Sequence, residues 1–232
     1  MFTMGPQHPA DELLVALLNS YFEDRDLSYH WKLEDRLTCP CNLIPPKRKP
    51  DSICALELHL PTFDKNHIMS LEQLLNDFFR EEELLENNAY VCDGCSKKTP
   101  HQRKKITLTG DCETLIISLK RALPNGDKNL LKVDYPTTGL SLSQWTSPRL
   151  ASRYDLTAVV HHIGERSSSG HYKSVCHDLL TDRWNLFDDT PHVAGNTVQL
   201  VNPNTSNLLR RNGTESILFY QKRRHRAGKY LF

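Results

Sequence analysis

The sequence predicts an α+β domain, in which helices come first and an antiparallel sheet follows. Apolar residues recur at helical spacing in two segments before residue 80, whereas from Lys105 onward short apolar stretches indicate strands. The chain has 232 residues, of which 38% are hydrophobic and 25% are charged. This is the composition of a globular protein with one large domain or two small ones.

The first predicted helix covers residues 10–24. Pro9 suits the first turn of a helix, where the missing backbone N–H costs nothing. The apolar side chains share one face of the helix, and this face would be exposed if the preceding part of the domain were missing: Leu13, Leu14, Leu17, Leu18, Tyr21 and Phe22.

The next segment, residues 28–55, is polar and predicts irregular structure with a basic loop at residues 47–49. Residues 55–60 alternate and predict a strand that Pro61 ends. A second helix begins at Ser70, which forms a capping box with Gln73. The buried stripe of this helix is predicted to be Leu71, Leu74, Leu75, Phe78 and Phe79. The acidic segment that follows, residues 80–86, is expected to face solvent.

Strands are predicted in the second half of the chain at residues 106–108, 114–119, 130–135, 154–161, 171–177, 183–189 and 217–220. The 114–119 segment is apolar enough for burial on both faces. Residues 148–149 and 167–170 are predicted loops. The basic segment 222–226 is interpreted as a solvated end, with nuclear import or an acidic partner as the alternative.

Composition also excludes several classes of protein. The net charge of +1 gives no sign of binding to nucleic acid or a membrane surface. No apolar run approaches the roughly 18 residues of a membrane-spanning helix. Residues 1–9 lack the basic and apolar regions of a signal peptide. We therefore expect a protein of the cytoplasm or nucleus that binds neither nucleic acid nor membranes.

The strongest chemical signal is a histidine and two aspartates on one predicted hairpin. Ser169-Gly170-His171-Tyr172 opens the first strand, and Trp184-Asn185-Leu186-Phe187-Asp188-Asp189 ends the second. A turn midway between them places His171 across from Asp188 or Asp189, where facing Cβ atoms lie about 4.5–5.5 Å apart. The carboxylate would fix the imidazole tautomer and leave the other ring nitrogen free to take a proton from a thiol. The alternative is a solvated hairpin whose polar residues have no such role.

Four of the seven cysteines form two close pairs, Cys39-Pro40-Cys41 and Cys92-Asp93-Gly94-Cys95. Without an export signal, they predict a metal site rather than disulfides. Zinc prefers four soft ligands in a tetrahedron; the second pair has the favoured spacing, and the first pair departs from it. The alternatives are inert cysteines at a former metal site, or a substitute ligand from His59 or His101. The remaining thiols are predicted to be buried: Cys54, Cys112 and Cys176.

From Gln7 to about Lys222 the chain resembles the ubiquitin-specific protease family of deubiquitinases. Residues 7–14, Gln-His-Pro-Ala-Asp-Glu-Leu-Leu, resemble the family's Gln-Gln-Asp-Ala-His-Glu-Phe-Leu box. Residues 70–95 resemble the segment that leads into its second cysteine pair, and residues 115–121 its Leu-Lys-Arg-Phe strand. Residues 154–164 lead into the Gly-His-Tyr box at 170–172, and residues 217–220 resemble the final strand. Each segment is weak alone, but their order is that of the family.

The resemblance implies a papain-like cysteine protease hand with partial thumb helices, zinc-bearing fingers and an antiparallel β palm. The catalytic domain would be partial and cover residues 1–223. Within it, residues 1–30 would be a thumb remnant, about 31–110 the fingers and connecting helix, and about 111–223 the palm. A basic tail would follow at residues 224–232.

The resemblance also implies thiol-dependent hydrolysis at the C-terminal glycine of ubiquitin, so that ubiquitin and ubiquitinated proteins would be the partners. His171 would be the general base, Asp188 would orient it, and Asp189 would support the oxyanion region. The substrate side, including the channel for the Gly-Gly tail of ubiquitin, would involve Gly170, Tyr172 and Trp184. A structural zinc ion would be held by Cys39, Cys41, Cys92 and Cys95.

The chain departs from the family pattern at several positions. Ala122 replaces the usual phenylalanine after Lys120-Arg121, and Pro9 and Asp11 alter the first box. The family's cysteine box lies upstream of Gln7, and none of the seven cysteines has its Asn- and Gly-rich setting. We therefore expect the C-terminal part of a thiol isopeptidase that is inactive alone, because His171 has no thiol to activate. The alternatives are an inactive ubiquitin-binding relative and a zinc-stapled interaction module with no ubiquitin role.

Overall fold

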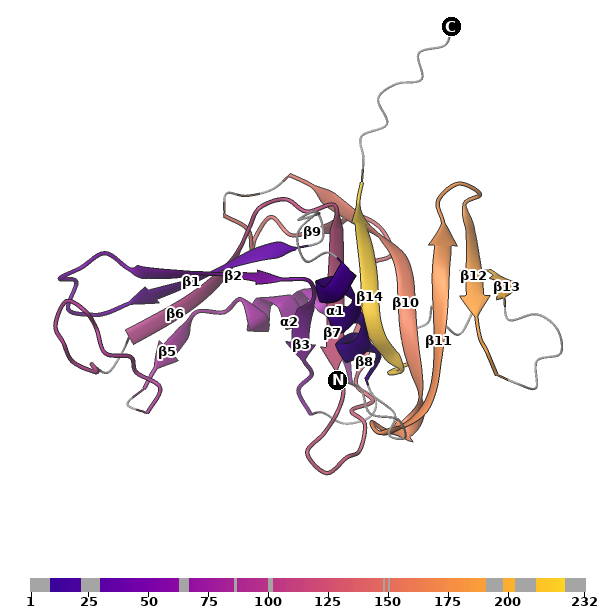
Figure 1. The fold of residues 1–232 in the computed structure, drawn as a ribbon, viewed down its shortest axis with the longest axis horizontal. Coiled ribbons are helices and arrows are strands. Elements are labelled where there is room, and N and C mark those ends of the chain that lie inside the picture. Colours follow the sequence, from indigo (N-terminus) through magenta and orange to yellow (C-terminus); the bar gives the residue numbers. More distant parts are fainter. Residues whose placement is uncertain are drawn as a thin grey trace, which may run out of the picture.

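The computed structural model describes residues 9–21, 30–62, 67–85, 87–99, 102–147, 149, 151–190, 198–202 and 212–223. These residues form a four-stranded sheet, an eight-stranded sheet, a two-stranded ribbon and two helices. The four-stranded sheet projects from one side of the larger sheet (Figure 1). The predicted α+β class is confirmed, with strands contributing most of the structure.

The four-stranded sheet has the order β2-β1-β6-β5 and is antiparallel throughout. Its strands are β1 (Trp31–Thr38), β2 (Lys47–Ile53), β5 (Glu82–Leu84) and β6 (Gln102–Thr109). The prediction of irregular structure over residues 28–55 is therefore wrong for most of that segment. In β1, the buried Trp31 and Leu33 alternate with polar neighbours, which is the pattern of a strand with one covered face.

The eight-stranded sheet has the order β13-β12-β11-β10-β14-β7-β3, with β9 paired to β10. The β3–β7 pair is parallel, whereas the other strand pairs of this sheet are antiparallel. Of the predicted loop 167–170, residues 169 and 170 already belong to a strand. The strands are β3 (Leu56–His59), β7 (Thr114–Lys120), β9 (Leu140–Ser141), β10 (Arg153–Arg166), β11 (Ser169–Asp178), β12 (Arg183–Phe187), β13 (Val198–Val201) and β14 (Glu215–Lys222).

The second helix, α2 (Leu71–Phe78), begins where the sequence predicts. The Ser70 hydroxyl accepts a hydrogen bond from the Gln73 backbone amide, and the Gln73 side-chain oxygen accepts one from the Ser70 backbone amide. These two bonds complete the capping box. Ser70 also ends β4 (Ile68–Ser70), which pairs in parallel with β8 (Lys132–Asp134). The apolar stripe of α2 is buried in the main core.

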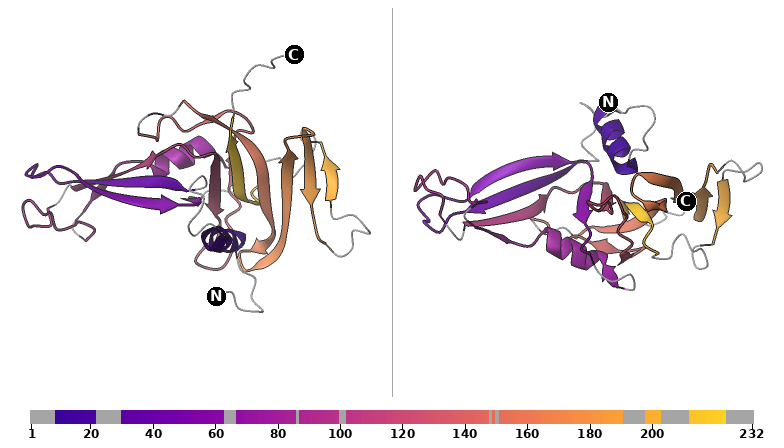
Figure 2. Two further views of the ribbon diagram at one scale, coloured as in Figure 1. Left: turned by 45° about the horizontal axis from the view of Figure 1, so that its top comes forward. Right: turned by 90° about the horizontal axis from the view of Figure 1, so that it is seen from below.

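The first helix, α1 (Ala10–Tyr21), and α2 lie on opposite sides of the eight-stranded sheet (Figure 2). Leu14 and Leu18 pack against a small cluster around Ile116 and Ile217. Leu13 and Leu17 are 46% and 55% exposed, so only part of the apolar face of this helix is buried. The last predicted residues of this helix, 22–24, lie outside the described residues.

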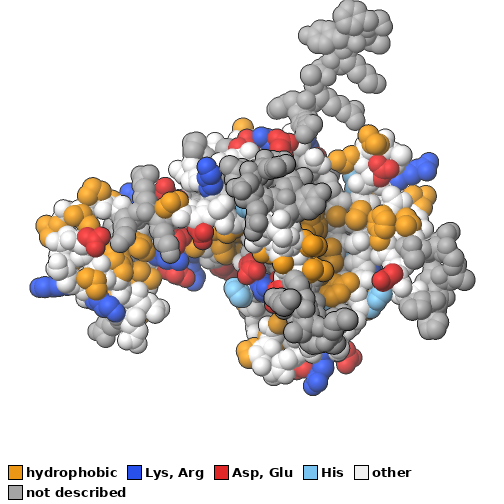
Figure 3. All heavy atoms as spheres, viewed as in Figure 1, with side chains coloured by type: hydrophobic (Ala, Val, Ile, Leu, Met, Phe, Trp, Pro, Cys, Tyr) orange, Lys and Arg blue, Asp and Glu red, His pale blue; other side chains and the backbone are white. Residues whose placement is uncertain are grey.

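The β12–β13 edge carries an apolar surface. Phe187 lies opposite Val198 in the ladder, and Leu200 lies two residues further along the same face of β13. All three side chains are exposed, in a region where hydrophobic atoms reach the surface (Figure 3). Among the described residues, no helix is long and apolar enough to cross a membrane.

Candidate active site and cysteine cluster

The predicted histidine–aspartate pair meets at the end of the β11–β12 hairpin. Ser174 faces Phe187, and the same register continued places Thr190 opposite His171. The prediction that His171 directly faces Asp188 or Asp189 is therefore wrong in register. The pair forms because β12 ends at Phe187 and the chain leaves the ladder, which lets Asp188 reach His171.

Asp188 is the centre of this cluster and is only 8% exposed. Its Oδ1 lies 2.8 Å from His171 Nε2 and accepts the Thr190 hydroxyl at 2.5 Å. Its Oδ2 lies 2.6 Å from Lys173 Nζ. With Nε2–H donating to this carboxylate, Nδ1 is the His171 nitrogen left to accept a proton. Asp189 is exposed, and its Oδ1 lies 3.6 Å from His171 Nε2.

These contacts set the protonation of Asp188. The hydrogen bond from Lys173, followed by those from Thr190 and His171, holds the pKa of Asp188 well below its usual range. The carboxylate therefore stays ionised in the folded protein and can act as a fixed acceptor for the imidazole N–H.

Replacing Asp188 with asparagine is expected to flatten the acid side of the stability curve. Because the folded-state pKa lies below the unfolded value of about 3.9, the ionised carboxylate stabilises the fold above about pH 4. That stabilisation is lost as the pH falls through the folded-state pKa. Urea unfolding from pH 7 to pH 2 measures the change, with the exposed Asp189→Asn variant as control. Identical slopes in the two variants would contradict the assignment.

The predicted substrate-side residues divide into two groups. Gly170 precedes His171, and a Cβ atom there would lie 2.5 Å from His162 Nε2. Tyr172 packs on the His162 ring, and its hydroxyl accepts the Ala10 amide at 3.2 Å. Trp184 lies away from this site, where it faces His177 in the ladder and stacks on its ring. At roughly 3.3 Å per residue, His177 is about 20 Å along β11 from His171.

The two cysteine pairs meet at the far end of the four-stranded sheet. Cys39 follows β1 and Cys92 and Cys95 precede β6, and these strands pair so that Thr38 lies opposite Arg103. The Sγ atoms of Cys39 and Cys95 are 4.0 Å apart, and those of Cys41 and Cys92 are 3.7 Å apart. All four Sγ atoms lie within 4.8 Å of one another, and all four cysteines are free.

This spacing fits one tetrahedral metal ion. Four thiolates at a zinc–sulfur distance of about 2.3 Å have neighbouring sulfurs about 3.8 Å apart, whereas a disulfide would require about 2.05 Å. Two thiols of the cluster are shifted in opposite directions: the hydrogen bond with Thr99 lowers the pKa of Cys39, whereas burial and hydrogen bonds with the other three cysteines raise the pKa of Cys41. The chain turns directly after the Cys-Pro-Cys segment: Asn42 adopts a left-handed φ of 52°, and its amide donates to the Cys39 carbonyl at 3.2 Å.

The other predicted ligands and thiols lie elsewhere. His59 ends β3 and is not in the cluster, and His101 lies outside the described residues. Burial raises the pKa of Cys54 and raises that of Cys112 to about 11. Cys176, on β11, is only partly buried. None of the seven cysteines, all within the described part of the chain, is a hydrogen-bond partner of His171.

Comparison with known proteins identifies the architecture. A family model described as "Ubiquitin carboxyl-terminal hydrolase" matches residues 1–220. The chain belongs to this family. Ubiquitin carboxyl-terminal hydrolase 21 from Bos taurus and from Homo sapiens are each 34% identical over 126 residues, which is 53% of this chain and 22% of each relative.

Solved structures show the same fold. The SAGA module of Ubp8, Sgf11, Sus1 and Sgf73 bound to ubiquitin aldehyde matches with a TM-score of 0.73 and 21% identity, over 94% of this chain and 50% of that one. A related module bound to monoubiquitin matches with a TM-score of 0.73 and 22% identity, over 94% and 49%. This member of the ubiquitin carboxyl-terminal hydrolase family therefore spans about half the length of these solved chains.

Two residues near these sites were not predicted from the sequence of this hydrolase-family chain. Lys173 follows His171 by two positions on one strand, and this spacing puts both side chains on the same face. Gln102 is fully buried beside the cysteine cluster, and its side chain bonds both the amide and the carbonyl of Tyr90 at 2.9 Å. No local pattern around Gln102 distinguishes it from a surface glutamine.

Proposed function

We propose that this chain supplies the general base and its orienting carboxylate for thiol-dependent hydrolysis at the C-terminal glycine of ubiquitin. The observation that carries this proposal is the 2.8 Å contact between His171 Nε2 and the buried Asp188. Family membership and the titles of related structures, which hold ubiquitin aldehyde or monoubiquitin, support the choice of substrate. Ubiquitinated proteins would be the corresponding full substrates.

In the proposed reaction, His171 Nδ1 takes the proton of a thiol while Nε2–H stays bonded to Asp188. The thiolate attacks the glycine carbonyl, and the imidazolium returns the proton to the leaving amine. Water then hydrolyses the thioester, which releases ubiquitin. Lys173 holds the second oxygen of Asp188 and so fixes the carboxylate, and Asp189 is proposed to support the oxyanion region.

The thiol is the component that the described site does not contain. Four of the seven cysteines form the cluster, Cys54 bonds Asn19 of α1, Cys112 bonds the His30 carbonyl, and Cys176 lies on β11. None of them bonds to His171. We therefore propose that the 232-residue chain alone is inactive. A ubiquitin probe with a thiol-reactive C-terminus should form no adduct with it, and modification of any of the seven cysteines would overturn this proposal.

Ubiquitin recognition is expected to depend on its C-terminal tail. Gly170 is packed against the His162 ring, where a Cβ atom would lie 2.5 Å from Nε2, so a larger residue at this position would displace the strand beside His171. Gly170 and Tyr172 are proposed to line the channel for the tail. Calorimetric titration should show saturable binding of intact ubiquitin and binding weaker by about ten-fold or more for ubiquitin without its last two glycines. Failure of both ligands to bind would leave only the zinc-stapled interaction module.

We propose zinc as the ion of the cysteine cluster, held by Cys39, Cys41, Cys92 and Cys95. When bound, zinc would act structurally, because four cysteines leave no open coordination position. Gly94 lies where the two turns approach closely, since a Cβ atom there would lie 3.1 Å from the side chains of Leu43 and Ile44.

Gln102 is expected to position this ligand set. Its Nε2 lies 3.9 Å from Cys39 Sγ, and its two bonds to Tyr90 fix the backbone just before Cys92. Since outer-shell partners of metal ligands typically contribute 10–100-fold in affinity, Gln102→Leu should weaken zinc binding by about that factor. Competition with a chelator measures it. The exposed Gln144→Leu variant serves as control, and equal affinities of the two variants would contradict the role.

A further inference from the structure

A groove lies where β1 and β6 meet the end of α2 and the turn around Trp145. Its volume is about 590 Å³, within the roughly 300–1,000 Å³ of typical ligand pockets. Trp145 stacks on Phe79 with ring centroids 6.2 Å apart, and its carbonyl accepts the Leu108 amide at 2.9 Å. The Ser147 amide donates to the Leu108 carbonyl at 2.9 Å, which ties this wall to β6. The groove is therefore preformed.

Three exposed cations line this groove, which we call the basic groove: Arg36 of β1, Lys105 of β6 and Arg149. Within the described part of the chain, none of the three forms an ion pair with a carboxylate. The next cation along β6 differs, because Lys104 pairs with Asp35 at 3.3 Å on the other face of the sheet. The uncompensated positive charge of this sheet region is thus concentrated in the basic groove.

Two of these cations face each other directly, since Arg36 lies opposite Lys105 in the β1–β6 ladder. Facing side chains of an antiparallel pair have Cβ atoms about 4.5–5.5 Å apart, and like charges there are destabilising. Glu34 is the one carboxylate among the described lining residues, two positions before Arg36 on the same face and diagonal to Lys105. One carboxylate does not balance three cations, so an anionic ligand would relieve this repulsion.

The polar groups beside these cations suit a peptide backbone. The side-chain oxygen of Asn76 accepts the Trp145 indole N–H at 3.1 Å, which orients the side-chain NH₂ of Asn76 as a donor. Thr107 and Ser147 add hydroxyl groups to the lining. Trp145 and Phe79 are only 6% and 5% exposed, so neither ring offers a platform on which bases could stack. Together with the net chain charge of +1, this favours an acidic peptide over a nucleic acid.

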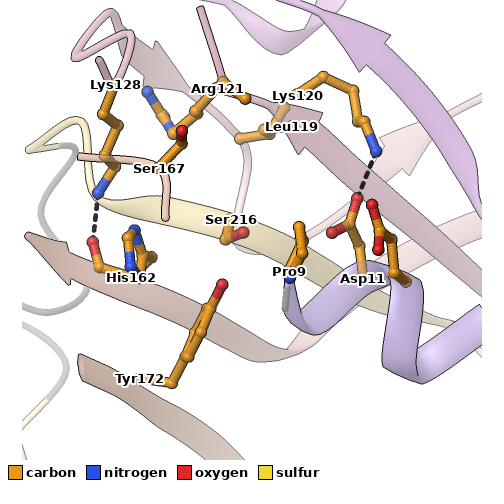
Figure 4. Close-up of a pocket in the computed structure, with 12 residues that line it drawn as sticks. Pro9, Asp11, Leu119, Lys120, Arg121, Lys128, His162, Ser167, Tyr172 and Ser216 are labelled. Atoms are coloured by element: carbon orange, nitrogen blue, oxygen red, sulfur yellow. Dashed lines mark hydrogen bonds and ion pairs between the residues drawn. The ribbon is translucent and has the colours of Figure 1, made fainter. Parts of the chain in front are cut away.

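We propose that the basic groove binds an acidic segment of a partner protein, whose carboxylates pair with Arg36, Lys105 and Arg149. The backbone of this segment bonds the polar groups of the lining. The groove includes the end of α2, whereas Tyr172, which follows His171, points toward the first turn of α1 (Figure 4). Because α1 and α2 lie on opposite sides of the eight-stranded sheet, this surface is separate from the site of the proposed hydrolysis and requires no thiol.

Fluorescence anisotropy of a labelled peptide of six glutamates, titrated with the full chain, tests this proposal. We expect saturable binding that weakens as the salt concentration rises, because the three cations are exposed. A labelled peptide of six glutamines should bind about ten-fold more weakly or worse. A labelled oligothymidylate of the same charge is the nucleic-acid comparison. Equal binding of the two peptides, or tighter binding of the oligothymidylate, would overturn the proposal.

Two double variants of equal charge locate the binding. Arg36→Gln/Lys105→Gln should lower the affinity for the glutamate peptide about ten-fold, as the combined effect of two exposed ion pairs. Arg166→Gln/Arg183→Gln removes the same charge at exposed positions of β10 and β12, outside the groove, and should leave the affinity unchanged. Equal affinities of the two double variants would mean that the peptide binds elsewhere and that the assignment is wrong.

A further variant predicts a gain of affinity, which misfolding would not produce. Glu34→Gln removes the lining carboxylate and should raise the affinity for the glutamate peptide about two- to five-fold, because one repulsive contact is lost. This result also tests the proposal where Arg36→Gln/Lys105→Gln does not fold. An affinity that Glu34→Gln leaves unchanged or lowers would contradict binding of the acidic segment in the basic groove.

Discussion

Replacing Cys92 with serine is expected to abolish zinc retention and to unfold the four-stranded sheet locally. Cys92 is fully buried in the cluster, and its Sγ lies 3.7 Å from that of Cys41. In small zinc domains the metal contributes about 10–16 kcal/mol of binding free energy at pH 7, and this is largely folding free energy. The cluster joins β1 to β6, so these strands should lose most of their amide protection.

Elemental analysis and hydrogen exchange measure the two effects. The Cys92→Ser chain should hold less than about half a metal ion, with fast exchange in β1 and β6 and continued protection in β7 and β14. Cys112→Ser is the matched control, because this thiol is also buried but donates to the His30 carbonyl at 2.9 Å, outside the cluster. Metal content and protection that survive in Cys92→Ser would contradict a zinc-dependent sheet.

Local patterns predicted the elements whose stability depends on local contacts. The Ser70 capping box fixed the start of α2, and the apolar 114–119 run predicted the buried strand β7. The β1–β2 hairpin was not predicted, because β2 has the sequence Lys-Arg-Lys-Pro-Asp-Ser-Ile, which shows no strand pattern. This segment is a strand because it pairs with β1. The alternation of Trp31 and Leu33 was the available signal for β1.

The candidate site was predictable in composition but not in geometry. The spacing of His171 and Asp188 predicted that they would meet, whereas the contact depends on the end of β12 at Phe187, beyond which the chain leaves the ladder. Lys173 could have been found from its two-residue spacing to His171. The hydrogen bond from Lys128 Nζ to the His162 carbonyl on β10 joins residues far apart in the chain, so the local sequence does not predict it.

The amphipathic pattern of α1 shows a similar limit. Periodicity correctly places Leu14 and Leu18 on the packed side, but it assigns Leu13 and Leu17 to the same stripe. A helix that rests on one face of a sheet buries a narrower stripe than one enclosed on several sides. How much of the helix is covered depends on its neighbours, which the sequence of the helix does not specify.

Replacing Arg121 with leucine is expected to destabilise the fold by about 3–5 kcal/mol, because it leaves Glu215 as an uncompensated buried charge. The side chains of Arg121 and Glu215 are 5% and 0% exposed. Arg121 also donates to the carbonyl oxygens of Asn129 and Leu131 at 2.8 Å each. One side chain therefore joins β7, β14 and the segment before β8.

Urea unfolding of three variants tests this assignment. Arg223→Leu breaks an exposed pair with Asp155 at 2.6 Å and should cost less than about 1 kcal/mol. The double variant Arg121→Leu/Glu215→Leu removes both buried charges and should recover part of the loss seen in Arg121→Leu. A cost for Arg121→Leu no larger than that for Arg223→Leu would show that the buried pair does not stabilise this junction. In that case the hydrogen bonds from Arg121 to the carbonyls of Asn129 and Leu131 would not be needed to hold this segment. The bond from Lys128 to the His162 carbonyl on β10 would then have to fix the segment alone.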